Sequence, residues 1–482
     1  MDDRILAAVD RAESLALALE ARLAGGRRAE TPDAGPRPPG PAPRPGRVLG
    51  SIGYYLRFAS DPIRFVGERF ERYGDVYDAP GPDGHLFGVR HPDHLHEVLV
   101  TRAAHFDKMH SAFRQLAELL GEGLLTSAGE HWRRHRRMIQ PAFGQARLAG
   151  YARAMSKEAA LAAARLADGE TVDVARLMME LTLRVVSRAL FSHDAGGATT
   201  ETVSRAMAAF QARATSVEFA LPWVPTPRRA RARRAFEELD RMVYRLIASR
   251  RGAAAPDPPD LLHMLVTAID PEGDGTGLSE KEVRDELVTL FLAGHETTSN
   301  ALTWTFYLLS QNPRAWEKLA AEVDAALGGR APEHADLERL PYTEQVVKEA
   351  MRLRPPVFMV ARRAREDTSI GGYPVRHGTE VVLWFYHTHH DARWYPDPEA
   401  FVPERFAPDE EAKLPKLAYV PFGAGPRACI GKTFAMIEAR LILAAFVQKV
   451  RFELPPGARV EAAPRITLGP KNGLAMRVAR RA

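Results

Sequence analysis

The chain has 482 residues, of which 45% are hydrophobic and 26% are charged, as in an ordinary globular protein with a large core. Its net charge of +5 and pI of about 9.2 fit nucleic acid, an anionic membrane surface or an acidic protein partner, so charge alone selects none of them. No apolar run approaches the roughly 18 residues of a transmembrane segment, the start at Asp2 and Asp3 is unlike a signal peptide, and the chain has one cysteine. We therefore expect a cytoplasmic protein without a transmembrane segment.

The N-terminal region has two parts. Residues 4–24 have helical periodicity, with Ile5, Val9 and Leu19 on one stripe and a mixture of Arg and Glu opposite, which favours a docking or solvated helix over a membrane-binding one. Residues 31–46 are rich in Pro and Gly and predict a stiff, extended linker. We assign residues 1–30 to an amphipathic helical extension, and residues 47–482 to one large domain.

The first part of that domain mixes helices and short strands. We predict a helix from Asp61 to Tyr73, two strands around the turn at residues 81–84, and a helix from Asp93 to Thr101. Residues 105–123 are apolar but irregular. Residues 131–137 then open a helix with a strongly basic run, which is usually a solvated face; no aromatic platform or nucleic-acid motif accompanies it.

Helices dominate residues 144–251, with a Pro-rich break at residues 221–227 and a basic helix start at residues 228–234. Residues 270–275 imitate the first half of a calcium loop. The twelfth position, which requires a bidentate glutamate, is Lys281, so we reject a calcium site.

A long helix follows. Ser279 and Glu282 form a capping-box pattern, and helical periodicity continues to about Ser310, which spans about 45 Å at 1.5 Å per residue. Its middle is apolar almost all round and is expected to be buried, yet polar residues interrupt it at Glu296 and Thr297. A buried pair of this kind costs several kcal/mol unless it is hydrogen-bonded. The alternative is a local kink in which the threonine hydroxyl bonds to the backbone.

The C-terminal third contains further elements. A helix is expected between Pro341 and Pro355, with Glu349 and Arg352 as i, i+3 neighbours. Residues 380–386 read as a strand leading into His387 and His389, a pair for which a surface strand end is favoured over a metal site. Residues 432–450 predict a helix, and residues 466–468 with the final segment predict a strand pair.

The only cysteine, Cys429, lies in a Gly- and Pro-rich turn just before that helix. A lone cysteine is most often a small buried apolar residue, but one at a helix start is stabilised as the thiolate and can ligate one metal ion. Residues 423–428 also satisfy a loose dinucleotide-binding fingerprint. That reading fails because no acidic residue lies about twenty positions on, and too little chain follows for a parallel sheet.

The loop resembles the haem-binding loop of the cytochrome P-450 superfamily, Phe-x-x-Gly-x-Arg-x-Cys-x-Gly. Phe422, Gly425, Arg427, Cys429 and Gly431 match every required position. With the other motifs, the resemblance covers most of the chain. It implies a mainly α fold with a small β region, in which one large domain has a long central helix over the haem.

The resemblance also implies roles for individual residues. Cys429 ligates the iron of haem b (iron protoporphyrin IX), and Trp132 and Arg136, in the family's Trp-x-x-x-Arg pattern, bind a haem propionate, with Arg362 and Arg427 as further candidates. The adjacent Arg363 leaves the register at Arg362 open. On the long helix, Gly294 leaves room for dioxygen, Thr297 hydrogen-bonds the bound oxygen and Glu296 relays protons. Glu349, Arg352 and Arg405 form a structural charged triad. The cofactor-binding set also includes Phe422, and the expected substrate pocket comprises Phe113, Phe291, Ala293, Thr298, Val357, Phe358 and Met359.

The function implied is a bacterial-type haem-thiolate monooxygenase that hydroxylates or epoxidises a lipophilic small molecule with dioxygen. We expect a monomer that does not bind nucleic acid. No electron-transfer module is fused to the chain, so a separate ferredoxin or flavodoxin with its reductase is expected. A basic face would steer this partner; it comprises Arg133, Arg134, Arg137, Lys413, Lys416 and Lys432. The alternatives are a peroxide-driven peroxygenase, which would usually lack the Glu296–Thr297 pair, and a non-catalytic haem sensor, which would need no proton relay.

Overall fold

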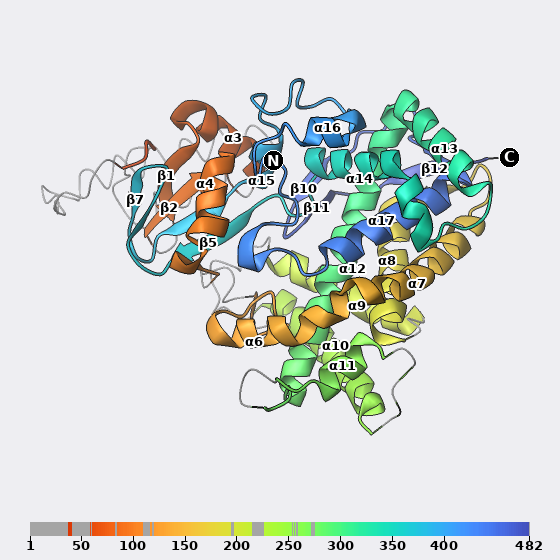
Figure 1. Cartoon of the computed structure of the whole chain (residues 1–482), viewed down its shortest axis with the longest axis horizontal. Coiled ribbons are helices and arrows are strands. Elements are labelled where there is room, and N and C mark those ends of the chain that lie inside the picture. Colours follow the sequence, from red (N-terminus) through yellow and green to blue (C-terminus); the bar gives the residue numbers. More distant parts are fainter. Residues whose placement is uncertain are drawn as a thin grey trace, which may run out of the picture. The chain divides into compact units, whose positions relative to one another are not determined.

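The structure, a computed structural model, describes residues 37–40, 58, 60–81, 84–108, 116–117, 120–193, 197–214, 226–252, 254, 256, 259–270 and 275–481. The predicted helix over residues 4–24, most of the linker, Phe113 and most of the break at residues 221–227 lie outside these residues. The described chain is mainly helical with small sheets, which confirms the predicted fold class (Figure 1).

The chain divides into two compact units. The first consists of Met1–Ser111, Met359–Trp394 and Pro415–Arg427, and the second of Ala112–Phe358, Tyr395–Leu414 and Ala428–Ala482. The boundary passes through the cysteine loop, between Arg427 and Ala428.

A five-stranded sheet in the order β1-β2-β8-β5-β3 forms the centre of the first unit. β1 and β2 are an antiparallel hairpin in which Val76 pairs with Val89, and β2 runs parallel to β8 with Leu86 opposite Glu380. The elements are α3 (Pro62–Tyr73), β1 (Val76–Gly81), β2 (Gly84–Val89), α4 (Pro92–His96), η1 (Glu97–Thr101), η2 (Ala103–His105), β3 (Phe106–Asp107), β5 (Val360–Ala364), β6 (Thr368–Ile370), β7 (Tyr373–Val375), β8 (Glu380–Leu383), α15 (Phe385–His389) and η7 (Gly425–Arg427).

The prediction for residues 380–390 is wrong in its second half. The strand β8 ends at Leu383, and Phe385–His389 form the short helix α15, so His387 and His389 do not alternate along a strand. Neither histidine lies at the surface. Burial lowers the pKa of His387 to about 3, and Nε2 of His389 accepts the backbone N–H of Val420 at 3.0 Å. Both side chains belong to the interior of the first unit.

Helices make up most of the second unit. Its elements are α6 (Gly129–Ile139), η3 (Gln140–Phe143), α7 (Gln145–Ala164), β4 (Thr171–Asp173), α8 (Val174–Phe191), α9 (Gly197–Ala214), α10 (Pro227–Arg250), α11 (Leu261–Thr267), α12 (Glu280–Gln311), α13 (Pro313–Leu327), η5 (His334–Arg339), α14 (Pro341–Leu353), η6 (Pro403–Phe406), α16 (Pro408–Glu411), α17 (Lys432–Val447), β9 (Val450–Glu453), β10 (Ala462–Pro464), β11 (Leu468–Pro470) and β12 (Ala475–Arg480).

The helix α12 is the axis of the second unit. Its start is the predicted capping box: Ser279 Oγ accepts the N–H of Glu282 at 3.2 Å, and Glu282 accepts the N–H of Ser279 at 2.7 Å. The 32-residue helix packs against α8, α10, α14 and α17 (Figure 1), and most of its side chains are buried. A helix that is apolar nearly all round is stable only when neighbours cover it in this way.

The small strands of the second unit pair differently from the prediction. Residues 468–470 form β11, which pairs with β10 so that Leu468 lies opposite Pro464. The C-terminal strand β12 pairs instead with β9 and β4, with Val478 opposite Phe452. The hairpin β10–β11 matters for the site because its turn, residues 465–467, contacts α9 and α12 through side chains described below.

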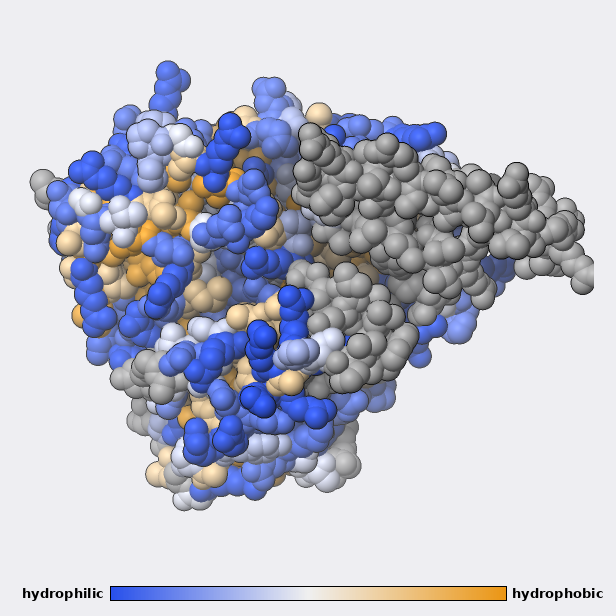
Figure 2. All heavy atoms as spheres, turned by 180° about the vertical axis from the view of Figure 1, so that it is seen from behind, coloured by the Kyte–Doolittle hydropathy of each residue, from blue (hydrophilic) through white to orange (hydrophobic). Residues whose placement is uncertain are grey.

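The surface is mainly polar. Among the residues that Figure 2 colours by hydropathy, hydrophilic side chains predominate, with smaller hydrophobic areas between them. The large hydrophobic residues that are exposed in the described part of the chain are Val100, Leu161, Tyr244 and Ile269. None of the described helices is both long and apolar enough to span a membrane.

Candidate active site

The cysteine loop has a backbone that requires glycine. Gly423 and Gly425 both have φ of +66°, in the left-handed region that other residues rarely adopt. A Cβ atom at Gly425 would also collide with the carbonyl oxygen of Leu99 in η1, so this glycine is required by close approach as well as by φ. The loop therefore lies directly against the backbone of the first unit at this point.

The thiol of Cys429 is exposed, which is unusual for a residue type that is normally buried. It precedes α17 by three residues. Within the same unit, Nη1 of Arg136 donates to the carbonyl oxygen of the adjacent Ala428 at 3.1 Å. Burial lowers the pKa of the Arg136 guanidinium, while Cys429 acts on it in the opposite direction. The structure thus brings Arg136 and the cysteine together, and Trp132 lies half-buried one helical turn earlier on α6.

Arg362 is a buried cation that lacks a carboxylate. Its side chain in β5 is 7% exposed, and the one hydrogen bond recorded for it goes to the neighbouring Ala361 carbonyl at 2.9 Å. Burial lowers its pKa to about 10, although the more distant Asp107 opposes this shift. No carboxylate of the described residues lies within ion-pair distance. A charged group buried in this way is stabilised by an anion, and a haem propionate is such an anion.

Arg362 rather than Arg363 has this environment. Strand residues alternate between faces, and in β5 Arg362 is buried whereas Arg363 is only half-buried. The sequence alone left the register between these two arginines open. Phe422 and Arg427 are also in the first unit, where both are half-buried and Arg427 ends the turn η7.

The middle of α12 has one open strip. Ala293 is exposed and Gly294 and Thr297 are half-buried, whereas nearly all neighbouring positions of the helix are buried. The Thr297 hydroxyl donates to the Ala293 carbonyl at 2.8 Å, the backbone bond that the sequence analysis gave as the alternative interpretation. A Cβ atom on Gly294 would meet Val186 at 3.4 Å, an ordinary contact. Packing within the protein therefore does not require glycine there.

Glu296 is buried, with 2% of its surface exposed, as the sequence analysis expected. Its Oε1 accepts hydrogen bonds from the Gln211 amide on α9 and from the Thr467 hydroxyl in the β10–β11 turn. Burial raises the pKa of this carboxyl, whereas the two hydrogen bonds lower it. Because burial has the larger effect, the carboxyl can carry a proton at a higher pH than an exposed glutamate.

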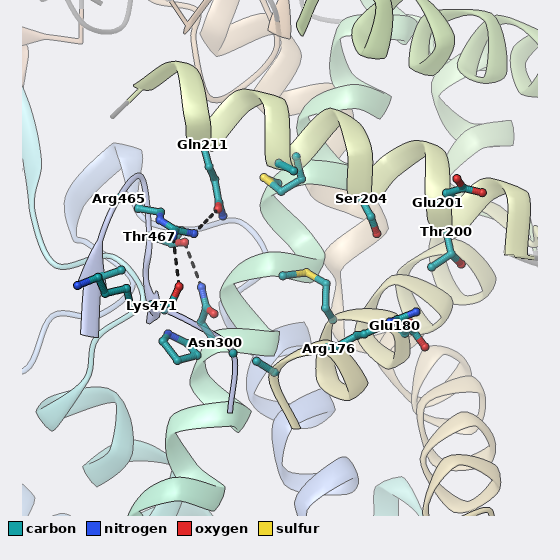
Figure 3. Close-up of a pocket in the computed structure, with 18 of the residues that line it drawn as sticks. Arg176, Glu180, Thr200, Glu201, Ser204, Gln211, Asn300, Arg465, Thr467 and Lys471 are labelled. Atoms are coloured by element: carbon teal, nitrogen blue, oxygen red, sulfur yellow. Dashed lines mark hydrogen bonds and ion pairs between the residues drawn. The ribbon is translucent and has the colours of Figure 1, made fainter. Parts of the chain in front are cut away.

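The partners of Glu296 line a polar cavity. Asn300 donates to Thr467 at 3.0 Å, and Arg465 donates to Gln211 at 3.3 Å. Figure 3 shows these side chains converging from α9, α12 and the β10–β11 turn. The cavity, of about 760 Å³, extends from here between α8 and α9. Residues 211, 300 and 467 are far apart in the sequence, so no local pattern predicted that they meet at Glu296.

The expected charged triad is assembled in the second unit. Arg352 and Glu349 are both fully buried and form a bidentate pair, with N–O distances of 2.7 and 2.8 Å, and Arg405 lies 3.5 Å from the same carboxylate. Arg352 also donates to the carbonyls of Pro398 and Ala400, and Glu349 accepts the N–H of Val402. The triad therefore ties α14 to the segment at residues 395–405.

Another fully buried glutamate, Glu438, was not singled out from the sequence. Glu438 on α17 is fully buried, and burial raises the pKa of its carboxyl well above the ordinary value. The available signal was one acidic residue within the stretch of residues 434–447, which is apolar apart from Glu438 and Arg440.

The expected pocket residues have varied surroundings. Phe291 is fully buried and packs on Phe191 of α8, with ring centroids 4.6 Å apart. This ring contact belongs to the core of the second unit. Phe358 and Thr298 are also buried, whereas Ala293 is exposed and Val357 and Met359 are half-buried.

The prediction of a basic face for a redox partner needs a correction. Arg134 pairs with Glu282 at 3.0 Å, and Arg137 with Asp270 at 2.7 Å, so these two arginines are engaged within the second unit rather than free for a partner. The sequence could not show this because both acids lie more than 130 residues away. Arg133, Lys413 and Lys432 are exposed in the second unit, as Lys416 is in the first, and Arg133 and Lys413 also have acidic neighbours on their own helices or turns.

The residues present suit a haem group. In the second unit, the exposed Cys429 offers one soft metal ligand, Arg136 suits a carboxylate, and α12 has an open strip in an otherwise covered helix. In the first unit, the buried Arg362 suits a carboxylate by itself. Together with the mainly helical fold, these features define a haem-thiolate protein.

The chain belongs to the cytochrome P450 family, whose family model, Cytochrome P450, matches residues 38–475. It is 35% identical over 425 residues to the cyclooctatin synthase of Streptomyces melanosporofaciens, covering 87% of this chain and 92% of the relative. Cyclooctat-9-en-7-ol 5-monooxygenase of the same organism is 34% identical over 419 residues, with 86% and 90% covered. Pentalenene oxygenase of Streptomyces avermitilis is 32% identical over 416 residues, with 85% and 91% covered. This protein is therefore a haem-thiolate monooxygenase.

Proposed function

We propose that this protein hydroxylates or epoxidises a lipophilic, cyclic, terpenoid-like molecule, using haem b and electrons from a separate ferredoxin or flavodoxin. The observation that carries the proposal is the exposed Cys429 thiol, with Arg136 bound to the adjacent carbonyl. The cytoplasmic location expected from the sequence belongs to the same proposal.

Cys429 is the proposed iron ligand, and Trp132, Arg136, Arg362 and Arg427 are the proposed donors to the haem carboxylates. The lowered pKa of Arg362 supports its part, because an anion beside it would remove the cost of burying the charge. When bound, a thiolate-ligated haem supplies the chemistry that activates dioxygen.

Gly294, Thr297 and Glu296 on α12 are the proposed oxygen-handling residues. The Thr297 hydroxyl donates its proton to Ala293, so its oxygen is left as an acceptor for a second donor. Burial raises the pKa of the Glu296 carboxyl, which favours its protonated form, and the cavity lined by Gln211 and Thr467 gives this group a path for proton exchange with water. Thr298 and the apolar residues near it are proposed to contact substrate.

The substrate class is supported by the relatives. Two of them are named for unsaturated cyclic compounds, cyclooctat-9-en-7-ol and pentalenene. We extend that chemistry to this chain as a proposal, ahead of the fatty acids, steroids and polyketides that a lipophilic pocket would also admit.

The electron donor is proposed to be acidic. Lys432, which is exposed three residues after Cys429, favours a negatively charged partner near the cysteine, and Arg133 is also exposed in the second unit. The rate of reduction by an acidic ferredoxin should fall as salt rises, because exposed charges are screened. A rate that is independent of ionic strength would contradict the proposed steering.

The first experiment is the spectrum of the purified, reduced, carbon-monoxide-bound protein. Thiolate ligation is expected, and its loss in Cys429→His with haem still bound would assign the ligand. A spectrum typical of histidine ligation in the parent protein would overturn the proposal.

The second experiment screens cyclic terpenes, fatty acids and steroids for a change in haem spin state. It is followed by product analysis with ferredoxin, reductase and NADPH, and separately with peroxide. Turnover by peroxide alone would favour the peroxygenase. A spin-state change without product in either system would favour the sensor.

A further inference from the structure

Two histidines and a glutamate converge outside the haem region, where the first turns of α6 and α12 meet. His131 and His135 are one turn apart on α6, with ring centroids 4.1 Å apart, and Glu282 is in the first turn of α12. One ligand atom from each residue lies within 4.8 Å of the other two. Among the described residues this is the group of His, Cys, Asp and Glu side chains with such spacing.

One distance within this group already matches a ligand pair of a small tetrahedral ion. Nε2 of His135 is 3.2 Å from Oε1 of Glu282. Two ligands of a tetrahedral Zn²⁺ with bonds of about 2.0–2.1 Å lie roughly 3.3 Å apart, so these two atoms already have the separation of a ligand pair. A second histidine at i+4 places its ring on the same helix face.

The ring of His135 is held as metal-bound histidines usually are. Its Nδ1 is 2.6 Å from Oε1 of Glu286, a carboxylate on the next turn of α12 that is completely buried. Glu286 is positioned in turn by the backbone N–H of Leu124 at 3.1 Å. A carboxylate that fixes one imidazole nitrogen directs the other toward a metal and makes it a stronger ligand.

Space for a further ligand is present. Glu282 forms part of the wall of an open hollow of about 580 Å³, together with Arg134 and residues 276–279. A water molecule there can complete the coordination after two nitrogens and one carboxylate oxygen. The nitrogen and oxygen donors suit Zn²⁺ better than Ca²⁺ or Mg²⁺, which prefer oxygen alone.

We propose that His131, His135 and Glu282 form a Zn²⁺ site that joins α6 to the start of α12, with Glu286 as the residue that orients His135. In the ion-free arrangement Glu282 accepts from Arg134 at 3.0 Å, and His135 lies between two carboxylates. Binding replaces the proton on Nε2 of His135 by the ion, and Arg134 retains its bonds to the carbonyl of Gly277 and to Thr276. The ion would hold the helix that carries Trp132 and Arg136, without contact with substrate.

Zn²⁺ titration of the full-length, haem-loaded protein tests the proposal, after removal of any affinity tag and treatment with a chelator. We expect one equivalent to bind with a measurable rise in Tm, since a ligand that binds only the folded state stabilises it. His131→Ala should weaken binding at least tenfold and abolish the rise in Tm, and Glu286→Gln should weaken it about 10- to 100-fold. Mg²⁺ should produce neither effect.

His105→Ala is the matched control, because His105 is also a partly exposed histidine beside a glutamate, Glu366, but has no second histidine. Its Zn²⁺ affinity should equal that of the parent. Haem content and circular dichroism show whether each variant is folded, and His131→Asn provides a second variant if alanine destabilises α6. Absence of stoichiometric binding, or binding unaffected by both His131 variants, would overturn the site. The result does not depend on the proposed substrate.

Discussion

Glu296→Gln separates the chemical role of this residue from its structural one. Oε1 of the parent side chain accepts both hydrogen bonds, from Gln211 and Thr467. A glutamine keeps a carbonyl oxygen of the same shape that accepts the same two donors. The free energy of unfolding should therefore change by less than about 1 kcal/mol, which is the net worth of a typical hydrogen bond.

The variant cannot supply a proton from a carboxyl. General acid catalysis contributes about 10²- to 10⁴-fold, which corresponds to about 3–5 kcal/mol of barrier. We expect the rate of product formation to decrease by a factor within this range. NADPH is still consumed, and its electrons go to peroxide or water. The quantity to measure is product formed per NADPH oxidised, with ferredoxin and reductase in excess and a substrate identified by its spin-state change.

Glu201→Gln is the matched control. Glu201 belongs to α9 and lines the same cavity, but it pairs with Arg205 and is not bonded to Gln211 or Thr467. Its product yield per NADPH should equal that of the parent. If Glu296→Gln retained the parent yield while fully folded and haem-loaded, the assignment of Glu296 as a proton donor would be wrong.

Three further outcomes follow from the geometry. Gly425→Ala should lose haem and stability together, measured by haem content and thermal melting, because a Cβ collides with Leu99 and φ is +66°; a variant as stable as the parent would refute the close approach. Arg352→Leu removes the bidentate partner of the buried Glu349 carboxylate, leaving Arg405 at 3.5 Å as its cationic neighbour, and should cost about 3–5 kcal/mol in urea unfolding. A cost below about 1 kcal/mol would contradict the triad's structural role. His295 is fully buried and its pKa is lowered to about 4, so its neutral form stabilises the fold above pH 6.5. About 3 kcal/mol is then lost as pH falls from 6.5 to 4, and His295→Asn should lack this part of the pH dependence.

Some features of this protein follow from residues close together in the chain. The cysteine loop can be recognised from the sequence because Gly425, Arg427 and Cys429 lie within five residues of one turn. The capping box of α12 can be recognised because Ser279 and Glu282 are three residues apart. The helical periodicity of α12 and α14 is likewise local, since each side chain's face depends only on its position along its own helix. These local patterns were enough to predict the family, the loop of the proposed iron ligand and the main helices.

Tertiary structure decided the features that depend on which distant segments meet. In the folded protein, Arg134 pairs with Glu282 and Arg137 with Asp270. Burial lowers the pKa of His387, and Arg362 is buried whereas the adjacent Arg363 is only half-buried. Tertiary structure also brought Gln211 and Thr467 to Glu296, and His131 and His135 to Glu282. Sequence periodicity assigns a residue to a face of its own element, but the hydrogen-bond partner, the burial and hence the pKa depend on the element packed against that face.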